Sequence, residues 1–343
     1  MEPRARAVGL SAPRSPRGAL TRGLRALLDP FLVSIIATMV LAIVLPLGET
    51  PRAVASGAAD VAVALLFLAY GMRLPTREVL EGLRNWRLQL AIVVSTYAIF
   101  PLLGLAVHPL ATPLVGSALA AGLLYTALLP STVQSSVAFT SIARGNVPGA
   151  LCAATLSNIG GMFVSPALVL LVMGRTTSGG GGIGDIVSQL LVPFVVGQLL
   201  QPLVGGWVRA HRGLTLAIDR GTIVLAVFSA VAAATAIGVW EGVTALQVLA
   251  LVGLCALVLA AILAVTWWGG RLLGLRRADR IALLMCGSKK SLATGLPMGL
   301  VLFPAATAAT MVVPVVIFHQ LQLVVCTIIA DHLARTDPEP ALP

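Results

Sequence analysis

The sequence predicts an all-α polytopic membrane protein with ten transmembrane helices arranged as two inverted five-helix repeats. Composition, the spacing of apolar runs and the placement of basic residues together support this fold class. Of the 343 residues, 58% are apolar and 10% are charged, and the mean hydropathy is +0.97. Soluble domains carry about 25% charged residues. A soluble domain is therefore excluded. The formal net charge of +10 would suggest nucleic-acid binding in a soluble domain, but the positions of the basic residues favour another interpretation.

Apolar runs bounded by charges or by Pro and Gly define the expected spans. A spanning helix needs about 20 residues at a rise of ~1.5 Å per residue. The expected spans cover residues 30–47, 53–71, 88–107, 113–142, 147–173, 186–208, 217–239, 243–268, 281–303 and 305–330. Residues 1–29, rich in Pro and Arg, are expected to form a disordered tail, and residues 332–343 a second tail.

The basic residues follow the positive-inside rule, which predicts more Lys and Arg in cytoplasmic than in external loops. With the N-terminus inside, 19 of the 23 basic residues fall on cytoplasmic segments and only Arg52 and Arg175 fall outside. Both termini are therefore expected in the cytoplasm, and the plasma membrane is the expected location. No nucleic-acid partner is expected, because most of the positive charge is accounted for by topology.

A Gly-rich stretch over residues 175–185 separates two halves of nearly equal length, residues 30–174 and 186–331. This composition is typical of a flexible linker. Because five spans precede the linker, the second half enters the membrane in the opposite sense to the first. Inverted repeats of this kind are a common architecture of secondary transporters.

Polar residues interrupt the fourth and ninth expected spans at corresponding places. The first interruption covers residues 130–136, Pro-Ser-Thr-Val-Gln-Ser-Ser, and the second covers residues 286–291, Cys-Gly-Ser-Lys-Lys-Ser. In inverted-repeat transporters, such broken spans expose backbone groups near the membrane midplane, where substrates and ions bind. The two breaks therefore mark the expected binding site.

Lys289 and Lys290 are the only lysines of the chain and lie roughly 13 Å into the ninth span if that span is helical. An ammonium group at the bilayer centre is unfavourable by about 2.5–3.5 kcal/mol on insertion scales. Both side chains are therefore expected to face a cavity and find polar partners. In the alternative interpretation, the span begins at Ser291 and both lysines are cytoplasmic anchors.

Other polar residues at or near the breaks are candidate ligands for a substrate or ion, and the start of the half-helix after each break adds a positive dipole end. Alternatively, they satisfy backbone groups that Pro130 frees, and small residues near Asn158 serve close helix packing. The candidates are Thr132, Gln134, Ser135, Ser136, Asn158, Ser288 and Ser291.

Two ionisable residues in other spans are candidates for ion coupling or charge compensation. Asp60, in the second span, is a candidate counter-charge for a buried lysine, unless the end of that span frays and leaves it solvated. His319, in the tenth span, is a candidate proton relay, or a hydrogen-bonded packing residue. The sequence contains no HExxH, Gly-x-Ser-x-Gly or paired intramembrane carboxylates, so no enzymatic activity and no cofactor are expected.

The motifs PSTVQSSVAFTSIARGN, ATLSNIGGMFVSP and CGSKKSLATGLPMG resemble those of the bile acid:sodium symporter family, in its SBF-like branch. The resemblance covers residues 30–331. It implies ten spans in which spans four and nine cross at unwound centres. It also implies a panel domain of spans 1, 2, 6 and 7 and a core domain of spans 3–5 and 8–10.

The sequence departs from the pattern that the family's sodium-coupled members share. Their fifth-span hydroxyl positions fall on Ala150 and Ala154, and their ninth-span Glu and Gln fall near Met285 and Lys289. Their third-span Gln falls on Thr96, which is kept as a candidate coupling residue. Most of the oxygen ligands that sodium needs are therefore missing.

The leading functional hypothesis is a secondary active transporter of a small organic anion, either bile-acid-like or another carboxylate. It works by alternating access, and an ammonium from Lys289 or Lys290 replaces sodium. Two alternatives remain open: a non-transporting membrane regulator or scaffold with the same fold, and a sodium-coupled symporter with a rearranged ion site. The expected partners are the organic anion, the lipid bilayer and either sodium or a proton as coupling ion.

Overall fold

The computed structural model describes residues 30–45, 47–73, 85–174, 184 and 187–336. All regular structure within these residues is helical. Seven helices are long and apolar enough to cross a membrane, and two shorter apolar helices accompany them. The expected N-terminal tail, nearly all of the Gly-rich linker and the last seven residues lie outside the described residues. The all-α prediction is confirmed for the described part of the chain.

The helices follow the expected apolar ranges closely. The first half contains α2 (Pro30–Val44), α3 (Glu49–Arg73), α5 (Trp86–Val94), the π-helical turn η2 (Ser95–Ile99), α6 (Phe100–Val115), α7 (Ser117–Leu128), α8 (Gln134–Ile142) and α9 (Val147–Val172). The second half contains η3 (Val187–Leu191), α11 (Val192–Ala210), α12 (Arg212–Ala236), η4 (Val239–Gly242), α13 (Ala245–Leu272), α14 (Arg277–Gly287), α15 (Leu292–Leu302) and α16 (Ala305–Arg335).

Helices α5, η2 and α6 form one continuous span. The range expected for the fourth span, residues 113–142, is shared among the end of α6, α7 and α8. Residues 113–115 belong to α6, and α7 begins at Ser117. Gly116 between them has φ +82°, a conformation that favours glycine because it has no Cβ. The fourth span therefore begins at Ser117, four residues later than the expected start at residue 113.

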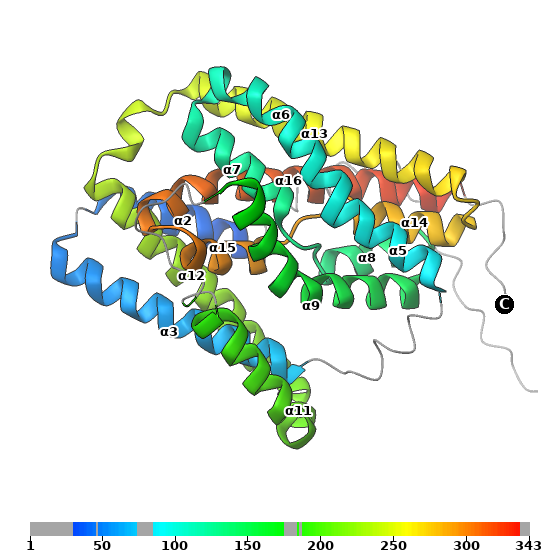
Figure 1. The fold of residues 1–343 in the computed structure, drawn as a ribbon, viewed down its shortest axis with the longest axis horizontal. Coiled ribbons are helices and arrows are strands. Elements are labelled where there is room, and N and C mark those ends of the chain that lie inside the picture. Colours follow the sequence, from blue (N-terminus) through cyan, green and yellow to red (C-terminus); the bar gives the residue numbers. More distant parts are fainter. Residues whose placement is uncertain (1–29, 46, 74–84, 175–183, 185–186, 337–343) are drawn as a thin grey trace, which may run out of the picture.

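The helices pack in two groups. Helices α2, α3, α11 and α12 lie together, with α3 packed on both α11 and α12, at the lower left of Figure 1. The other group contains α5–α9 and α13–α16, in which α6 packs on α7 and α13, and α16 packs on α7 and α15. Helix α12 joins the groups through contacts with α15 and α16. The cavity described below lies between the two groups.

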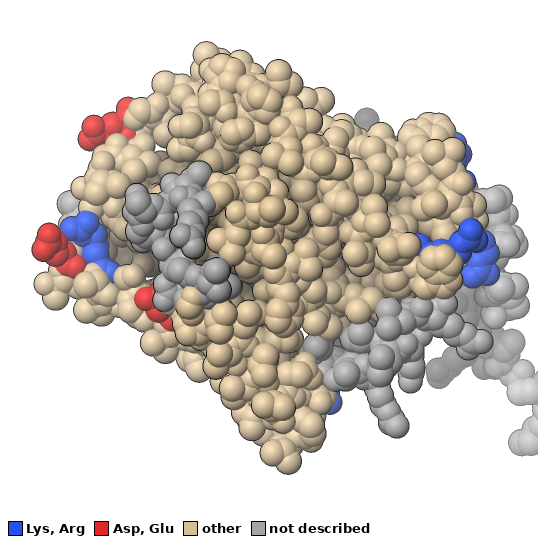
Figure 2. All heavy atoms as spheres, viewed as in Figure 1, with Lys and Arg blue, Asp and Glu red and all other residues tan. Residues whose placement is uncertain are grey.

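Charged side chains concentrate at the two ends of the molecule. Figure 2 shows most of the visible ones at the left and right ends of this face, with a further basic side chain at the lower edge. Large apolar side chains are exposed along α2, α6, α11 and α13, including Leu203 at 82% and Leu246 at 76%. Such exposure is expected when lipid, rather than water, surrounds the helices.

The close contact between α3 and α11 depends on two glycines. A Cβ at Gly71 would lie 2.2 Å from the carbonyl oxygen of Phe194, and a Cβ at Gly197 would lie 2.2 Å from that of Leu68. Small residues allow membrane helices to approach closely and gain dispersion energy. These glycines therefore fix the distance between the two helices.

We expect Gly71→Ala to lower the Tm of the purified protein in detergent, because the new methyl group forces α3 and α11 apart at a cost of about 1–3 kcal/mol. Gly57→Ala is the matched control, since it lies on the same helix with nothing within 4 Å of the new Cβ. Its Tm should be unchanged or slightly higher. Equal effects of the two substitutions would contradict the packing argument.

Candidate functional site

The two helix breaks meet in the interior of the molecule. Helices α7 and α8 are separated by residues 129–133, and α14 and α15 by residues 288–291. The N–H of Ser291 donates to the carbonyl of Pro130 at 2.8 Å. The hydroxyl of Ser131 donates to the carbonyl of Cys286 at 2.6 Å. The two breaks therefore bond each other directly.

Side chains from α9 support the first break. The Oγ of Ser157 accepts a hydrogen bond from the N–H of Ser131 at 3.0 Å, and the Nδ2 of Asn158 donates to the carbonyl of Ser131 at 3.0 Å. The hydroxyl of Tyr97 donates to the carbonyl of Ser157. A backbone group left unpaired inside a membrane would be unfavourable by several kcal/mol. These side chains therefore pair the backbone groups of Ser131 that the break in the helix leaves without helical partners.

Gln322 of α16 supports the second break. Its Oε1 accepts from the N–H of Lys290 and its Nε2 donates to the carbonyl of the same residue, both at 2.9 Å. The amide thus pairs both backbone groups of one residue, as a neighbouring strand would. His319 Nδ1 lies 2.8 Å from Gln322 Nε2, within hydrogen-bond distance. This contact fits the hydrogen-bonded packing role, and the proton relay stays a prediction.

Lys290 ties the two breaks to the third span. It is 1% exposed, and its Nζ donates to the carbonyl of Leu129 at 2.6 Å and to the carbonyl of Thr96 at 2.9 Å. The ammonium also lies 4.2 Å from the centre of the Phe100 ring. Charge-assisted hydrogen bonds and a cation–π contact are the means by which a buried ammonium is stabilised.

The carbonyl of Thr96 is available because of the π-helical turn. The N–H of Phe100 donates to the carbonyl of Ser95 instead of to that of Thr96, and residue 101 is a proline without an N–H. Neither residue 100 nor residue 101 therefore donates a backbone N–H to the carbonyl of Thr96, and the ammonium of Lys290 donates to it instead. The sequence analysis missed this carbonyl, and Pro101 is the signal in the sequence that could have indicated it; π-turns often occur at functional positions.

Lys289 is as deeply buried as Lys290 but is held more weakly. It is 0% exposed, and its Nζ lies 3.5 Å from the carbonyl of Ser135, a long hydrogen bond. The Nζ also lies 3.7 Å from the centre of the Phe139 ring. Among the described residues, neither ammonium has a carboxylate within ion-pair distance. The two neighbouring lysines therefore differ in environment, a difference that their adjacency in sequence does not reveal.

A cavity of about 490 Å³ lies beside the crossing, between the two helix groups. Several candidates for ligands line it: Thr132, Gln134, Ser135, Asn158, Ser291 and His319. The Oε1 of Gln320, another lining residue, is buried without a hydrogen-bond partner among the described residues. Apolar side chains such as Ile35, Met162 and Phe194 complete the walls.

Other candidates lie behind the cavity wall or away from it. Ser136 and Ser288 are buried, and their hydroxyls bond locally, to Thr132 at 3.2 Å and to the carbonyl of Leu284 at 2.5 Å. Lys289 and Lys290 do not line the cavity. Asp60 is exposed on α3 and has no ion pair with either lysine in the described structure.

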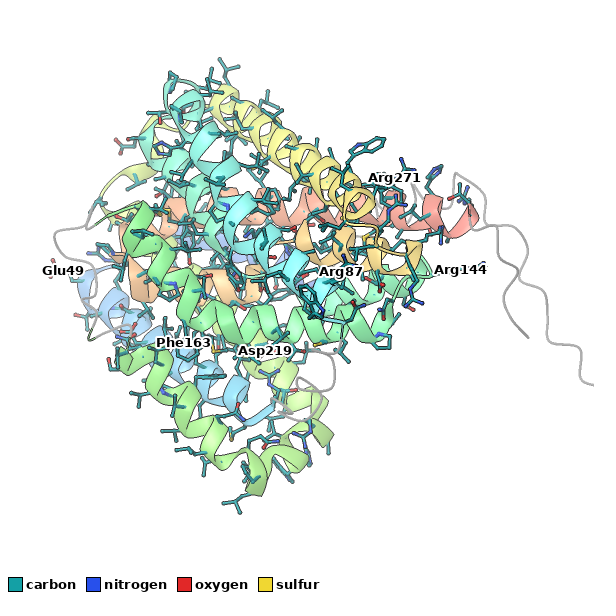
Figure 3. All side chains as sticks on the ribbon, turned by 45° about the vertical axis from the view of Figure 1, so that its right-hand side comes forward. Glu49, Arg87, Arg144, Phe163, Asp219 and Arg271 are labelled. Carbon is teal, nitrogen blue, oxygen red and sulfur yellow. The ribbon has the colours of Figure 1, made fainter. Side chains whose placement is uncertain are left out.

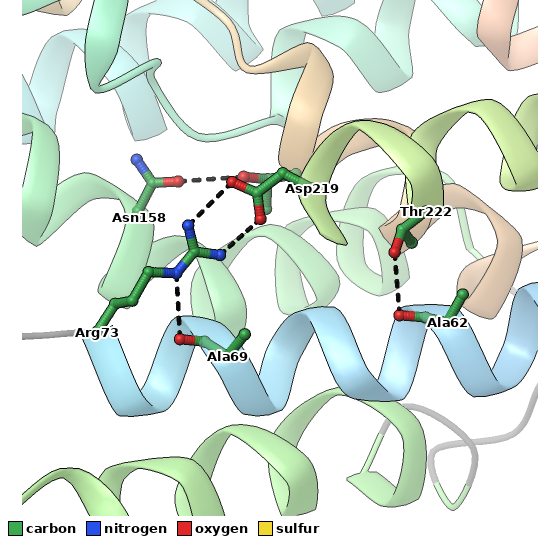
Figure 4. Close-up of polar contacts among 7 residues, drawn as sticks. Ala62, Ala69, Arg73, Asn158, Asp219 and Thr222 are labelled. Carbon is green, nitrogen blue, oxygen red and sulfur yellow. Dashed lines mark hydrogen bonds and ion pairs between the residues drawn. The ribbon is translucent and has the colours of Figure 1, made fainter. Parts of the chain in front are cut away.

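The cavity also contains an ion pair that the sequence analysis did not predict. Arg73, at the end of α3, bonds both carboxylate oxygens of Asp219 on α12, at 2.9 Å and 2.5 Å. Figure 4 shows this pair near Asn158, and Figure 3 shows Asp219 between the two helix groups. The partners are 146 residues apart in sequence, so no local pattern joins them.

Arg220, beside Asp219, also lines the cavity. Its guanidinium lies 5.2 Å from the centre of the Phe31 ring. Within the described chain it makes no ion pair, whereas Asp219 neutralises Arg73. The cavity therefore contains one uncompensated positive charge beside apolar walls, an arrangement that can attract an amphipathic anion.

No group of three or more His, Cys, Asp or Glu residues that could hold a metal ion occurs in the described part of the chain. The positions that correspond to sodium-binding hydroxyls in the resemblance, Ala150 and Ala154, are buried alanines. They offer no side-chain oxygen. Whether sodium binds at the crossing therefore depends on other oxygen donors, such as backbone carbonyls and hydroxyl groups.

Comparison with known proteins gives a consistent picture. Residues 29–335 match the SBF-like CPA transporter family. "Uncharacterized protein PA2026" of Pseudomonas aeruginosa is 42% identical over 91% of this chain and 94% of its own. "Putative symporter YfeH" of Escherichia coli is 39% identical over 90% and 94%, and mouse sodium/bile acid cotransporter 7 is 25% identical over 80% and 82%. The chain therefore belongs to the SBF-like CPA transporter family, as its break motifs indicated, and is a multi-pass membrane transporter.

Proposed function

We propose that this protein is a secondary active transporter of a small organic anion and that it works by alternating access. The observation that carries the proposal is the cavity of about 490 Å³ between the two helix groups, with the broken-helix crossing on one side and Arg220 on the other. Binding sites of inverted-repeat transporters lie at such broken helices. The family and the relative named as a symporter support transport rather than a scaffold role.

The proposed architecture has ten spans in two inverted repeats. Helices α2, α3, α5–α6, α7 with α8, and α9 form the first repeat, and α11, α12, α13, α14 with α15, and α16 form the second. In this proposal, α2, α3, α11 and α12 are the panel domain and the remaining helices are the core domain. The packing of the helices in two groups supports this division, and rocking of one group against the other would move the cavity from one membrane face to the other.

The substrate is proposed to be an amphipathic carboxylate or similar anion. Its charged group would bind the guanidinium of Arg220, because guanidinium groups pair well with carboxylates. Its apolar part would lie against Ile35, Met162 and Phe194, and a donor group on it would meet the unpaired Oε1 of Gln320. Because Asp219 already neutralises Arg73, the charge balance favours a substrate with a single negative charge.

Sodium is proposed to be replaced by the ammonium of Lys290. In a sodium-coupled relative, a cation would hold the carbonyl groups of the crossing together. Here Lys290 Nζ bonds the carbonyls of Leu129 and Thr96 and so joins α7, η2 and the second break. Lys289 is proposed to have the lesser structural role, since its single hydrogen bond is long.

The end of the molecule that carries Arg87, Arg144 and Arg271, opposite Glu49 in Figure 3, is proposed to face the cytoplasm. The positive-inside rule favours this orientation. Two residues that line the cavity lie toward the same proposed cytoplasmic side: Arg73 is the last residue of α3, and Arg220 lies in the first half of α12. The structure would then correspond to a state open toward the cytoplasm, with the plasma membrane as the proposed location.

A thermal-shift screen of the purified protein tests the transport proposal directly. We expect an amphipathic monocarboxylate, such as a sterol acid, to raise the Tm through binding to the folded state, and to do so without sodium. Inorganic phosphate and neutral analogues of the same acids are the controls. If no organic anion stabilises the protein, with or without sodium, the scaffold alternative is favoured; a sodium-dependent shift would instead support a rearranged sodium site.

Substitution of Arg220 tests its role as the anion anchor. We expect Arg220→Gln to weaken the affinity for the stabilising anion by about tenfold or more, since a hydrogen bond to a charged group contributes about 1.5–3 kcal/mol. Arg209→Gln is the matched control, because it removes the same charge from an exposed position on α11 outside the cavity. Equal affinities of the two variants would contradict the assignment.

The two lysines are tested against each other. We expect Lys290→Ala to lower the Tm more than Lys289→Ala, because it leaves the buried carbonyls of Leu129 and Thr96 unpaired, at about 1–3 kcal/mol each. Sodium, but not choline, should partly restore the Tm of Lys290→Ala and leave Lys289→Ala unchanged. If both variants keep wild-type stability and anion-specific uptake into proteoliposomes, the proposal that an ammonium replaces sodium is wrong.

A further inference from the structure

An arginine–tryptophan cluster lies where α13 ends and α14 begins, away from the cavity. It comprises Trp267, Trp268, Arg271 and Arg280, and we call it the α13–α14 corner. The guanidinium of Arg280 lies 4.3 Å from the centre of the Trp267 ring. That of Arg271 lies 4.9 Å from the Trp268 ring and 5.8 Å from the Trp267 ring. Trp267 therefore contacts both guanidinium groups, and Trp268 contacts that of Arg271 alone.

Two of the three guanidinium nitrogens of Arg280 are buried and make no hydrogen bond to the described residues. Its Nε and Nη2 atoms have almost no exposed surface and no hydrogen-bond partner among the described residues. The side chain runs over Gly270, where a Cβ would lie only 3.0 Å from the Cγ of Arg280. Packing therefore fixes the direction of the guanidinium, while its hydrogen-bonding capacity remains unsatisfied. A buried donor without a partner is unfavourable by about 1–3 kcal/mol, and so calls for an acceptor.

Among the described residues, no acidic side chain forms an ion pair with Arg271 or Arg280. Asp279, the acidic residue between positions 271 and 280, accepts hydrogen bonds from the amides of Asn85 at 3.2 Å and Asn146 at 2.6 Å. It also lies 3.8 Å from Arg276. Four arginines and one aspartate occupy residues 271–280, so the segment has a net charge of +3. An external anion would be attracted.

The surroundings of the corner are those of a membrane interface. Trp268 is 57% exposed and Leu272 is 89% exposed, and tryptophans are enriched at the level of the lipid headgroups. Basic side chains gather at this end of the molecule in Figure 2, and Figure 3 shows Arg271 at the same end as Arg144. The apolar face of α13 continues from the corner into the proposed membrane region.

We propose that the α13–α14 corner binds the phosphate of an anionic phospholipid. The phosphate oxygens would accept hydrogen bonds from the exposed guanidinium of Arg271 and from the guanidinium of Arg280 after a small rotation of that half-buried side chain, since guanidinium groups bind phosphate in a two-pronged manner. The acyl chains would lie along the exposed apolar face of α13. Basic pockets between helix ends are known to hold such headgroups. The site is separate from the transport cavity and independent of which anion is transported.

The test uses the full-length purified protein in a zwitterionic detergent, with bound lipid counted by native mass spectrometry. Phosphatidylglycerol, phosphatidylcholine and inorganic phosphate are added separately. We expect retention of phosphatidylglycerol, with a raised Tm, and little response to the other two. A response to inorganic phosphate that matches the response to phosphatidylglycerol would overturn the assignment to a lipid and indicate a soluble phosphate ligand.

Variants separate a built site from general positive charge. We expect Arg280→Gln to weaken phosphatidylglycerol binding by about tenfold or more; glutamine keeps the methylenes that lie on Gly270. Arg280→Lys, which keeps the charge but loses the planar fork, should also bind weakly. Arg276→Gln is the control, since it removes a charge from the same segment at a side chain that is 88% exposed.

Equal loss of binding in the Arg276→Gln and Arg280→Gln variants would mean that only diffuse charge attracts the lipid, and the proposal would be wrong. If the Arg280 variants fail to fold, Arg271→Gln provides the same test, because its exposed side chain lies on α13 and leaves α14 untouched. Wild-type phosphatidylglycerol binding in that variant would then overturn the proposed site.

Discussion

The hydrogen bonds from Lys290 to the carbonyls of Leu129 and Thr96 are the interaction on which the rest of this structure depends. Two helices are broken within the protein interior, and a broken helix leaves backbone groups that the hydrocarbon region of a membrane cannot satisfy. One ammonium provides partners for carbonyls of two different spans at once. A second pair of groups, the N–H and C=O of Lys290 itself, is satisfied by Gln322.

A continuous polar network connects this crossing to the cavity. Asn158 donates to the carbonyl of Ser131 in the first break, and its Oδ1 accepts from the hydroxyl of Thr294 after the second break. The Oγ of Ser291 caps the same helix through the N–H of Thr294. Anything that binds Asn158 or Thr294 from the cavity therefore acts on groups that hold both breaks. This arrangement gives the proposed substrate site a physical link to the crossing.

The two helix groups differ in how they are held together. In the group of α2, α3, α11 and α12, the glycine contact between α3 and α11 and the ion pair between Arg73 and Asp219 fix the helices to one another. In the other group, the crossing itself provides the polar contacts. The cavity lies at the boundary, where Arg73, Asp219 and Arg220 from one group face Asn158 and Thr294 from the other. The proposed rocking of one group against the other would change the contacts at this boundary.

Much of the fold could be predicted from the sequence, because the requirements of a membrane act locally along the chain. Spans follow from runs of apolar residues, and the breaks follow from Pro130 and from charged residues inside a span. The free carbonyl of Thr96, which Lys290 binds, was not predicted, although Pro101 could have indicated it. The sequence also determined that the lysines need partners, since an ammonium in an apolar span is unfavourable by itself.

The tertiary structure decided which groups meet. That Lys290 is firmly bonded and Lys289 is not, that Asp60 lies away from both, and that Arg73 pairs with Asp219 all depend on distances between residues far apart in sequence. Hydropathy and charge patterns report whether a residue faces lipid, water or protein. They contain no information on which distant side chain comes within about 3 Å, and hydrogen bonds and ion pairs act only at that range.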